Sequence, residues 1–330
     1  MILAIETSCD DTCAAVITEA GEIRANVISS QGIHDRYGGV VPEIASRHHL
    51  DLANLVVDEA LANAGATLDD VDLLAVTRGP GLVGALLVGV ATAKALAAAR
   101  GLPLAAVDHL QGHVAANFLS IDGAPPFEPP FLCLIASGGH TFLARVERHD
   151  GFEVLGRTLD DAAGEAFDKG ARLLGLPYPG GPHVERVAAE GDPKAFAFPT
   201  GKGVAGLDFS FSGLKTSLLY KLREFEEGQA PIADLAASYQ HAIVESLAVR
   251  VERAVAETGL RRVAIGGGVA ANGPLRARIE ALADVAVHVP PRALCTDNAA
   301  MIASAARYVA PHAFPDYLAL DAYATGQQAL

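Results

Sequence analysis

The sequence opens with Ile2-Leu3-Ala4-Ile5-Glu6-Thr7-Ser8, an apolar segment of strand length that ends in hydroxyl residues. The second half contains a similar segment, Leu132-Cys133-Leu134-Ile135-Ala136-Ser137-Gly138. Each segment is followed by a threonine and a second apolar segment, so the pattern predicts a strand, a tight turn and a strand, twice. Two hairpins that are alike by chance would give this pattern. A duplication, with two lobes and a nucleotide between them, would give it as well.

Apolar segments of strand length alternate with longer periodic segments along the chain. Strands are expected at residues 2–5, 13–17, 73–76, 104–107, 131–136, 142–146 and 263–265. Helices are expected at residues 43–64, 83–100, 231–258 and 273–282. This alternation predicts α/β layers rather than a helical bundle. The Pro-rich cluster at residues 122–130 is the best candidate for an exposed connection near a domain boundary, and residues 191–211 are expected to form a long loop.

The composition is that of a folded protein with a large core, since 51% of the 330 residues are hydrophobic and 19% are charged. The formal net charge of −14 argues against a broad basic face that coats nucleic acid. The most apolar stretch, residues 81–99, contains Lys94 and is typical of a helix buried in a soluble core rather than a membrane span. With no signal-peptide pattern and only four cysteines, we expect reduced thiols in a cytoplasmic protein.

The segment His109-Leu110-Gln111-Gly112-His113 follows a predicted strand and is the most specific local pattern. On a helix, this spacing places both imidazoles on one side, within reach of a single metal ion. Leu110 stands where a zinc protease of the H-E-x-x-H type has its glutamate. A structural role for both histidines is the alternative. Asp297 is a candidate third ligand or a helix N-cap, and two histidines with one carboxylate suit iron(II) or a similar divalent ion.

Two glycine-rich turns are candidates for binding phosphate, Ser137-Gly138-Gly139-His140-Thr141 and Gly266-Gly267-Gly268-Val269-Ala270-Ala271-Asn272. Glycines let backbone amides approach an anion, although tight turns also need glycine for geometry alone. A helix is expected to begin near Asp161, with that residue as the candidate N-cap. Asp168, later in this helix, is either a solvated charge or a ligand for a sugar hydroxyl. The hairpin turn at Asp10 and Asp11 is either an ordinary turn or a site that organises a metal, a water or an amine.

Taken in order, the motifs of this chain resemble those of one known family. The motifs are Ile5-Glu6-Thr7-Ser8-Cys9-Asp10-Asp11-Thr12, Thr77-Arg78-Gly79-Pro80-Gly81-Leu82, the histidine segment, Ser137-Gly138-Gly139-His140-Thr141, Asp161-Ala162-Ala163-Gly164-Glu165-Ala166-Phe167-Asp168-Lys169, Tyr178-Pro179-Gly180-Gly181-Pro182, Phe209-Ser210-Phe211-Ser212-Gly213-Leu214-Lys215, Gly267-Gly268-Val269-Ala270-Ala271-Asn272 and Cys295-Thr296-Asp297-Asn298. The chain is similar to the TsaD family, also called Gcp or YgjD, the transferases of tRNA threonylcarbamoyladenosine synthesis. The resemblance covers nearly the whole chain.

The resemblance implies an actin/sugar-kinase/heat-shock type (ASKHA) fold with two duplicated α/β lobes and a nucleotide cleft between them. The expected lobes are residues 1–108 and 109–330, with residues 310–330 packing back on the first lobe. The implied reaction transfers the threonylcarbamoyl group from threonylcarbamoyl-AMP to N6 of adenosine 37 in tRNAs that read codons beginning with A, releasing AMP. Three alternatives stand beside this transferase: a small-molecule kinase of this fold, a metalloprotease, and a catalytically silent partner that resembles the smaller relative of the family. The two histidines and Asp297 argue against the silent partner.

The resemblance also implies site residues. His109, His113 and Asp297 are the expected ligands of one divalent metal ion per chain, iron(II) first, with zinc and magnesium as alternatives. The expected adenylate-binding residues are Ile135, Ala136, Ser137, Gly138, Gly139, Asp168, Gly181 and Asn272. Asp10 is the candidate for handling the amine proton. Glu185 stands where the family often has an aspartate that meets the ribose.

The implied partners are tRNA, a smaller TsaB-like paralogue and a TsaE-like ATPase subunit, with no membrane. Because the net charge is negative, we expect only a local basic rim for tRNA. Candidates for this rim are Arg24, Arg36, Arg47, Lys202 and Lys215.

Overall fold

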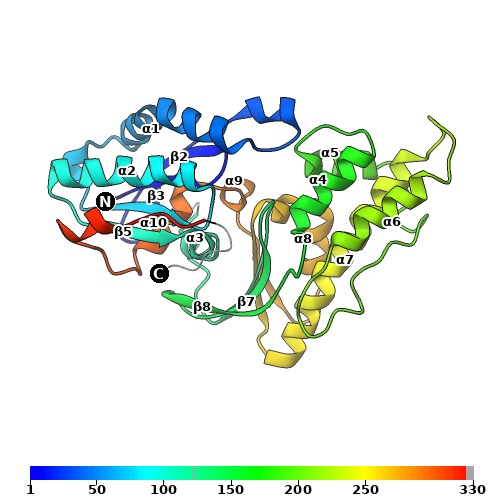
Figure 1. The fold of residues 1–330 in the computed structure, drawn as a ribbon. Helices are drawn as coiled ribbons and strands as arrows, with labels where there is room; N and C mark the ends of the chain where they lie inside the picture. Colours follow the sequence, from blue (N-terminus) through cyan, green and yellow to red (C-terminus); the bar gives the residue numbers. More distant parts are fainter. Residues whose placement is uncertain (122, 325–330) are drawn as a thin grey trace. The chain divides into compact units, whose positions relative to one another are not determined.

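Two five-stranded sheets form the framework of the computed structural model, which describes residues 1–121 and 123–324 (Figure 1). The strands of the first sheet are β1 (Ile2–Glu6), β2 (Asp11–Ile17), β3 (Ile23–Ser30), β4 (Leu73–Gly79) and β5 (Leu104–Asp108). Their order in space is β3-β2-β1-β4-β5. The first three strands are antiparallel, whereas β1, β4 and β5 are parallel, so the carboxyl ends of these three strands share one edge.

The second sheet repeats this plan. Its strands are β6 (Phe131–Ala136), β7 (Thr141–Arg148), β8 (Gly151–Arg157), β9 (Arg262–Gly266) and β10 (Ala286–His288), in the order β10-β9-β6-β7-β8. Reversed, this order matches the first sheet strand for strand. β6 pairs antiparallel with β7 and parallel with β9, as β1 does with β2 and β4. The duplication indicated by the sequence is therefore confirmed, and chance similarity of two hairpins is excluded.

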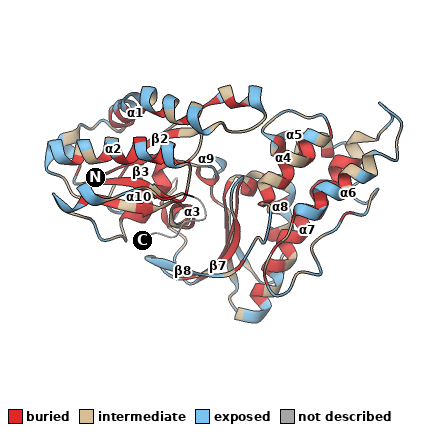
Figure 2. Ribbon diagram, in the orientation of Figure 1, coloured by how far each residue is buried: buried red, intermediate tan, exposed pale blue. Residues whose placement is uncertain are grey.

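Helices cover the first sheet, whose central strands β1 and β2 are buried almost throughout (Figure 2). The helices of this region are η1 (Gly32–Tyr37), α1 (Pro42–Ala64), η2 (Leu68–Asp70), α2 (Val83–Arg100), α3 (His109–Ala115), η3 (Ala116–Phe118), α10 (Ala299–Ala306) and η5 (Asp316–Ala319). Helices α1 and α2 pack on each other, and so do α3 and α10. α1 begins at a proline and ends at Gly65 with φ 65°, a conformation that favours glycine.

The second sheet packs against a larger set of helices. They are α4 (Ala163–Leu173), α5 (Gly180–Ala188), α6 (Ser212–Leu222), α7 (Ile232–Thr258), η4 (Gly268–Ala271), α8 (Gly273–Glu280) and α9 (Arg292–Cys295). The long helix α7 contributes many of the buried side chains of this core, among them Tyr239 and Leu247. Within residues 189–211 the structure contains no helix and no extended strand, which agrees with the expected long loop.

The chain divides into two compact units. The first unit comprises residues 1–128, 148–151 and 297 onward, and the second comprises 129–147 and 152–296. The division after Glu128 falls inside the Pro-rich cluster, of which Asp122 lies outside the described residues. It does not coincide with the boundary expected after Asp108, because α3 packs on α10 and so belongs to the first unit.

The segment that follows α10 packs in the first unit. His312 pairs with Leu104 of β5, and Tyr317 is part of the first core. Residues 325–330, which the sequence grouped with this segment, lie outside the described residues.

Helix α2 is long and apolar enough to cross a membrane by length and composition alone. In the first unit it contributes Val90, Ala93 and Ala97 to the core, and Lys94 donates a hydrogen bond to the carbonyl of Leu318. One side of α2 thus packs in this core, whereas the other side is exposed.

One local expectation is wrong. Helix α4 begins at Ala163 with Ala162 as its N-cap residue, so Asp161 is not the cap. The first amide of the helix, that of Ala163, donates instead to the Thr141 hydroxyl at 2.9 Å. Asp161 forms an ion pair with Lys169 at 2.6 Å.

Candidate metal centre and ligand cavity

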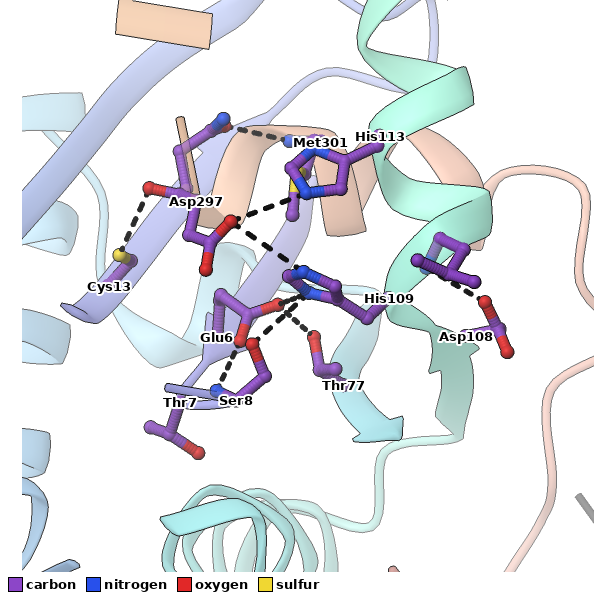
Figure 3. A network of polar contacts seen from close by, with 12 residues as sticks. Glu6, Thr7, Ser8, Cys13, Thr77, Asp108, His109, His113, Asp297 and Met301 are labelled. Carbon is purple, nitrogen blue, oxygen red and sulfur yellow. Dashed lines mark hydrogen bonds and ion pairs between the residues drawn. The ribbon is translucent and has the colours of Figure 1, made fainter. Parts of the chain in front are cut away.

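The two histidines are placed by the start of α3, directly after β5. Asp108 caps this helix, because its carboxylate accepts hydrogen bonds from the amides of Leu110 at 2.8 Å and Gln111 at 3.1 Å. The helix therefore begins at His109, and His113 follows one turn later on the same side (Figure 3). Both side chains are buried.

Gly112 lets α10 come close to α3. A Cβ atom at this position would lie 2.6 Å from Cδ1 of Ile302, so any larger residue would push α10 away. The cap of α10 is Asn298, whose Oδ1 accepts from the amide of Met301 at 3.0 Å. The alternative of Asp297 as the cap is therefore wrong, and its carboxylate reaches the histidines instead.

His109, His113 and Asp297 form one cluster whose ligand atoms all lie within 4.8 Å of one another. Oδ1 of Asp297 lies 3.3 Å from Nε2 of His113 and 3.6 Å from Nε2 of His109 (Figure 3). The two rings are edge to face, with centroids 4.6 Å apart. The structure thus brings together the three residues that the sequence selected as metal ligands.

Glu6, which sequence reasoning did not select, supports this cluster from the end of β1. Its Oε2 lies 2.9 Å from Nδ1 of His109 and accepts a hydrogen bond from the Thr77 hydroxyl at 2.6 Å. The bond to Nδ1 leaves Nε2 of His109 directed at Asp297 (Figure 3). A carboxylate that orients a histidine in this way is typical of metal sites. The one signal in the sequence was a glutamate at the end of an otherwise apolar strand.

Glu6 and His109 shift each other's pKa toward the charged form. Burial alone would raise the pKa of Glu6, but the charge of His109 and the hydrogen bonds from His109 and Thr77 hold it below its ordinary value. Burial would likewise lower the pKa of His109, but the carboxylates of Asp297 and Glu6 raise it to about 9. The cluster therefore has a strong attraction for a positive charge.

His113 provides the test of whether a cation fits this cluster. Both of its ring nitrogens are buried, and neither has a hydrogen-bond partner within residues 1–121 and 123–324. Its Nε2 lies near Asp297 but without hydrogen-bond geometry. A buried nitrogen without a partner is costly, and a cation at Nε2 would satisfy it. Two imidazoles and one carboxylate suit iron(II) and related divalent ions.

A cavity of about 320 Å³ lies within the second unit. The residues that line it are Gly138, Gly164, Phe167, Asp168, Tyr178, Pro179, Gly181, Pro182, Glu185, Gly268, Val269, Ala271, Asn272, Arg292 and Thr296. They come from the turn after β6, from α4 and α5, and from the segments that follow β9 and β10. Each of these segments contains a motif that the sequence analysis selected.

Five of the residues expected to bind the adenylate line this cavity: Gly138, Asp168, Gly181, Glu185 and Asn272. Ile135 and Ala136 are buried in β6, and Ser137 and Gly139 belong to the adjoining turn without lining the cavity. Cβ atoms built at Gly138 and Gly139 would meet nothing within 4 Å, so this turn leaves open space above its backbone.

Close packing behind the cavity requires glycine at two positions. Gly267 has φ +83°, and a Cβ there would lie 2.4 Å from the carbonyl oxygen of Ala136. A Cβ at Gly164 would lie 2.6 Å from the carbonyl oxygen of Ser137. The glycines therefore bring the turn after β9 and the start of α4 against the end of β6.

The acidic residues of the cavity already hold its wall together. Glu185 accepts from the amide of Gly273 at 3.0 Å and from Nδ2 of Asn272 at 3.2 Å, and so anchors the start of α8. Asp168 accepts from the amide of Gly180 at 2.7 Å. Burial raises the pKa of Asp168, although the bond from Gly180 opposes the shift. A ligand hydroxyl donating to Asp168 would stabilise its charged form.

Asp10 lies in the turn between β1 and β2, which α1 holds in place. His49 of α1 is fully buried, with Nε2 3.0 Å from the carbonyl oxygen of Cys9 and Nδ1 2.8 Å from the Thr12 hydroxyl. The carbonyl of Asp10 accepts from the amide of Gln31 at 3.2 Å. The backbone around Asp10 is thus fixed on two sides.

Comparison with known proteins agrees with the motifs. A family model described as TsaD, tRNA N6-adenosine threonylcarbamoyltransferase, matches residues 22–304. A protein of that name from Symbiobacterium thermophilum is 52% identical over 314 residues, which cover 94% of this chain and 91% of the relative. Another from Anaeromyxobacter dehalogenans strain 2CP-1 is 54% identical over 312 residues, which cover 92% of each chain.

Solved structures of low sequence identity share the fold. HypF from T. kodakarensis superposes with a TM-score of 0.60 at 17% identity, over 92% of this chain and 47% of that one. Component A of the (R)-2-hydroxyglutaryl-CoA dehydratase of Acidaminococcus fermentans gives 0.56 at 17% identity, over 93% and 96%. The expected ASKHA fold with two duplicated α/β lobes is confirmed. From its motifs, its site residues and its relatives, this chain belongs to the TsaD family of tRNA N6-adenosine threonylcarbamoyltransferases.

Proposed function

We propose that this chain transfers the threonylcarbamoyl group from threonylcarbamoyl-AMP to N6 of adenosine 37 in tRNAs that read codons beginning with A. The observation that carries the proposal is the buried cluster of His109, His113 and Asp297, supported by Glu6. A small-molecule kinase has no evident use for such a cluster. A protease of the H-E-x-x-H type would need a glutamate where Leu110 stands.

The proposed donor is a mixed anhydride, so the protein need not supply a covalent nucleophile. N6 of the adenosine forms a bond to the carbamoyl carbon, the bond from that carbon to the phosphate oxygen breaks, and AMP leaves with the electron pair. The amine loses one proton. Asp10, on the fixed β1–β2 turn, is our candidate for accepting it. Because the amine is a poor nucleophile, alignment of the reactants would supply much of the rate.

The cavity of the second unit is the proposed site of the adenylate. Asp168 and Glu185 would accept hydrogen bonds from ribose hydroxyls, and Asn272, Gly181 and the segment from Ile135 to Gly139 would enclose the rest. Arg292 also lines the cavity and has no ion pair among residues 1–121 and 123–324. We assign it to the anionic part of the donor, since a guanidinium binds phosphate and carboxylate well.

The cluster of the first unit is the proposed metal centre, with one iron(II) ion per chain. Zinc and magnesium remain the alternatives that a metal analysis distinguishes. When bound there, the cation would polarise a carbonyl or phosphate oxygen of the donor. His109 and His113 would bind it through Nε2, and Asp297 through its carboxylate.

The proposed acceptor is a base of the anticodon loop that leaves its stack to reach the site, as single-stranded RNA bases do. Among the candidates for a basic rim, Arg24 and Arg47 already form ion pairs with Glu22 and Glu43. Arg36, Lys202 and Lys215 have no ion pair within the described chain and are the stronger candidates. We propose that a TsaB-like paralogue and a TsaE-like ATPase contribute the remaining tRNA contacts, in the cytoplasm.

The test is a nucleoside analysis by mass spectrometry. Unmodified tRNA would be incubated with the purified full chain, threonylcarbamoyl-AMP and the two partners, with the His113→Ala protein in parallel. We expect threonylcarbamoyladenosine at position 37 with the native chain and none with the variant. The proposal fails if the native chain forms none, or if it transfers the γ-phosphate of ATP to a metabolite instead.

A further inference from the structure

Tyr323, far along the chain from the metal centre, lies against the ends of the two strands that lead into it. Its side chain is buried. Its hydroxyl donates a hydrogen bond to Oδ2 of Asp108, the last residue of β5. Its backbone amide donates to the carbonyl of Arg78 near the end of β4 at 3.0 Å. The same residue therefore contacts two neighbouring strands at the edge where the cluster lies.

The contact with Asp108 acts on the helix that carries the histidines. One carboxylate oxygen of Asp108 accepts from the amides of Leu110 and Gln111, and the other accepts from Tyr323. The tyrosine thus holds the cap in the orientation that lets α3 begin at His109. If the cap turned, the first turn of α3 would lose its support, and His109 lies in that turn.

The contact with β4 acts on the residues that hold Glu6. The Arg78 guanidinium lies over the Tyr323 ring, 5.4 Å from its centroid. Gly79 has φ +152°, and a Cβ there would lie 2.5 Å from the carbonyl oxygen of Tyr323 and 2.8 Å from its ring. Thr77, two residues earlier, donates to Glu6, and Glu6 in turn holds His109. Tyr323 is therefore packed against the backbone that places this pair.

The segment that carries Tyr323 is built into the first unit. Tyr317 is fully buried, and Lys94 of α2 donates to the carbonyls of Leu318 and Leu320. These contacts fix the chain a few residues before Tyr323. The tyrosine therefore comes to Asp108 from a fixed segment.

We infer that Tyr323 is a positioning residue for the metal centre, acting through Asp108 on His109 and His113. This inference rests on the proposed metal centre. It predicts that removing the Tyr323 hydroxyl weakens the binding of a divalent cation while the protein remains folded. Tyr323 contacts the cap residue of α3 and the backbone of β4, so its effect is expected to reach the metal through Asp108 and the neighbouring strand.

The experiment is a titration of the metal-free full chain with Co²⁺, followed by visible d–d absorption. We expect Tyr323→Phe to raise the dissociation constant for Co²⁺ about three- to tenfold and to change the shape of the Co²⁺ spectrum. This effect is smaller than that of removing a residue that contacts a metal ligand directly. The matched control is Tyr317→Phe. It removes the same atom from the same segment, but the Tyr317 hydroxyl has no hydrogen-bond partner among the described residues. The control should bind Co²⁺ as the native chain does.

Asp108→Ser separates positioning from general packing. Serine is a good N-cap, so α3 should still begin at His109, but the second oxygen, which accepts from Tyr323, is gone. In this background Tyr323→Phe should change the dissociation constant less than twofold. The inference is overturned if Tyr323→Phe binds Co²⁺ as the native chain does, or if its effect is the same with Asp108→Ser. If the native chain itself binds no Co²⁺, the metal centre is wrong, and the inference falls with it.

Discussion

The turns after β1 and β6 occupy equivalent places in the two duplicated sheets and yet differ in charge. The turn after β1 follows Glu6 and contains Asp10, and Asp11 begins β2 directly after it, whereas the turn after β6 contains Ser137, Gly138 and Gly139. The first turn adjoins a cluster of histidines and carboxylates. The second leaves open space above its backbone and adjoins a cavity. We therefore expect the duplicated framework to provide the position, and the residues of each turn to bias the proposed site toward a cation or an anionic ligand.

The largest effect is expected where the first turn supports a metal ligand. Glu6→Ala should lower the affinity for a divalent cation about 100-fold, because the buried Nδ1 of His109 loses its carboxylate partner and keeps only the Ser8 hydroxyl, 3.2 Å away. Glu6→Gln keeps a hydrogen-bond acceptor, so its affinity for the cation should fall by less than that of Glu6→Ala. Isothermal titration of the metal-free variants with Co²⁺ measures both. Equal affinities in the native chain and both variants would mean that Glu6 does not support the site.

The surplus of acidic residues at and next to the first turn should also appear in the pH dependence of stability. Burial raises the pKa of Asp11 to about 6, with a further contribution from the negative charges of Asp297, Asp10 and Glu6 and a partial offset from Ser30. Because this pKa lies above that of the unfolded chain, Asp11 favours folding below about pH 4, and this contribution is lost as pH rises through 6.

Asp11→Asn should therefore stabilise the metal-free chain at pH 7 by about 2 kcal/mol and leave its stability unchanged near pH 4. Urea unfolding at a series of pH values measures the difference. A constant difference at all pH values would show that Asp11 does not carry the charge effect.

Arg292 tests whether the second site binds an anionic donor as proposed. Arg292→Ala should raise KM for threonylcarbamoyl-AMP about tenfold with a smaller change in kcat, because the contact would be made in the ground state and the transition state alike. Arg292→Lys keeps the charge, so its KM should lie between those of the native chain and Arg292→Ala. An unchanged KM in steady-state assays would remove Arg292 from the donor site.

The smallest effect is expected from adding a methyl group to the turn after β6. Gly138→Ala should weaken donor binding about threefold and leave stability within about 0.5 kcal/mol, since its Cβ meets nothing in the protein. Gly164→Ala is the contrasting control, because its Cβ would meet the Ser137 carbonyl and should destabilise the fold. Thermal melts and donor titrations distinguish the two. If Gly138→Ala binds the donor as tightly as the native chain does, the donor does not bind against this turn.

The parts of the fold that depend on local pattern could be predicted from the sequence. Strands such as β1 and β6 are short apolar segments, and helices such as α2 have clear ends. The edge strands β3 and β8 were missed because their residues are mostly half-buried or exposed, which leaves little apolar signal. The boundary between the units was placed too early because the packing of α3 on α10 joins distant parts of the chain.

The residues of the candidate site also divide into those that a local pattern predicts and those that only tertiary contacts determine. His109 and His113 were found from their spacing, which is a property of one helix. Glu6 was missed because its contact with His109 joins residues far apart in the sequence. The choice between Asp297 and Asn298 as the cap of α10 depends on backbone geometry and on where each side chain finds a partner. The structure resolves both points through tertiary contacts, which no local pattern contains.

Gly112, between the two histidines, has a consequence for how this family can vary. Because a Cβ at position 112 would meet Cδ1 of Ile302, a larger residue there is compatible with the cluster only if the residue at 302 becomes smaller. Positions 112 and 302 are therefore expected to covary among relatives that keep both histidines and Asp297. In relatives that have lost these ligands, the two positions should vary independently.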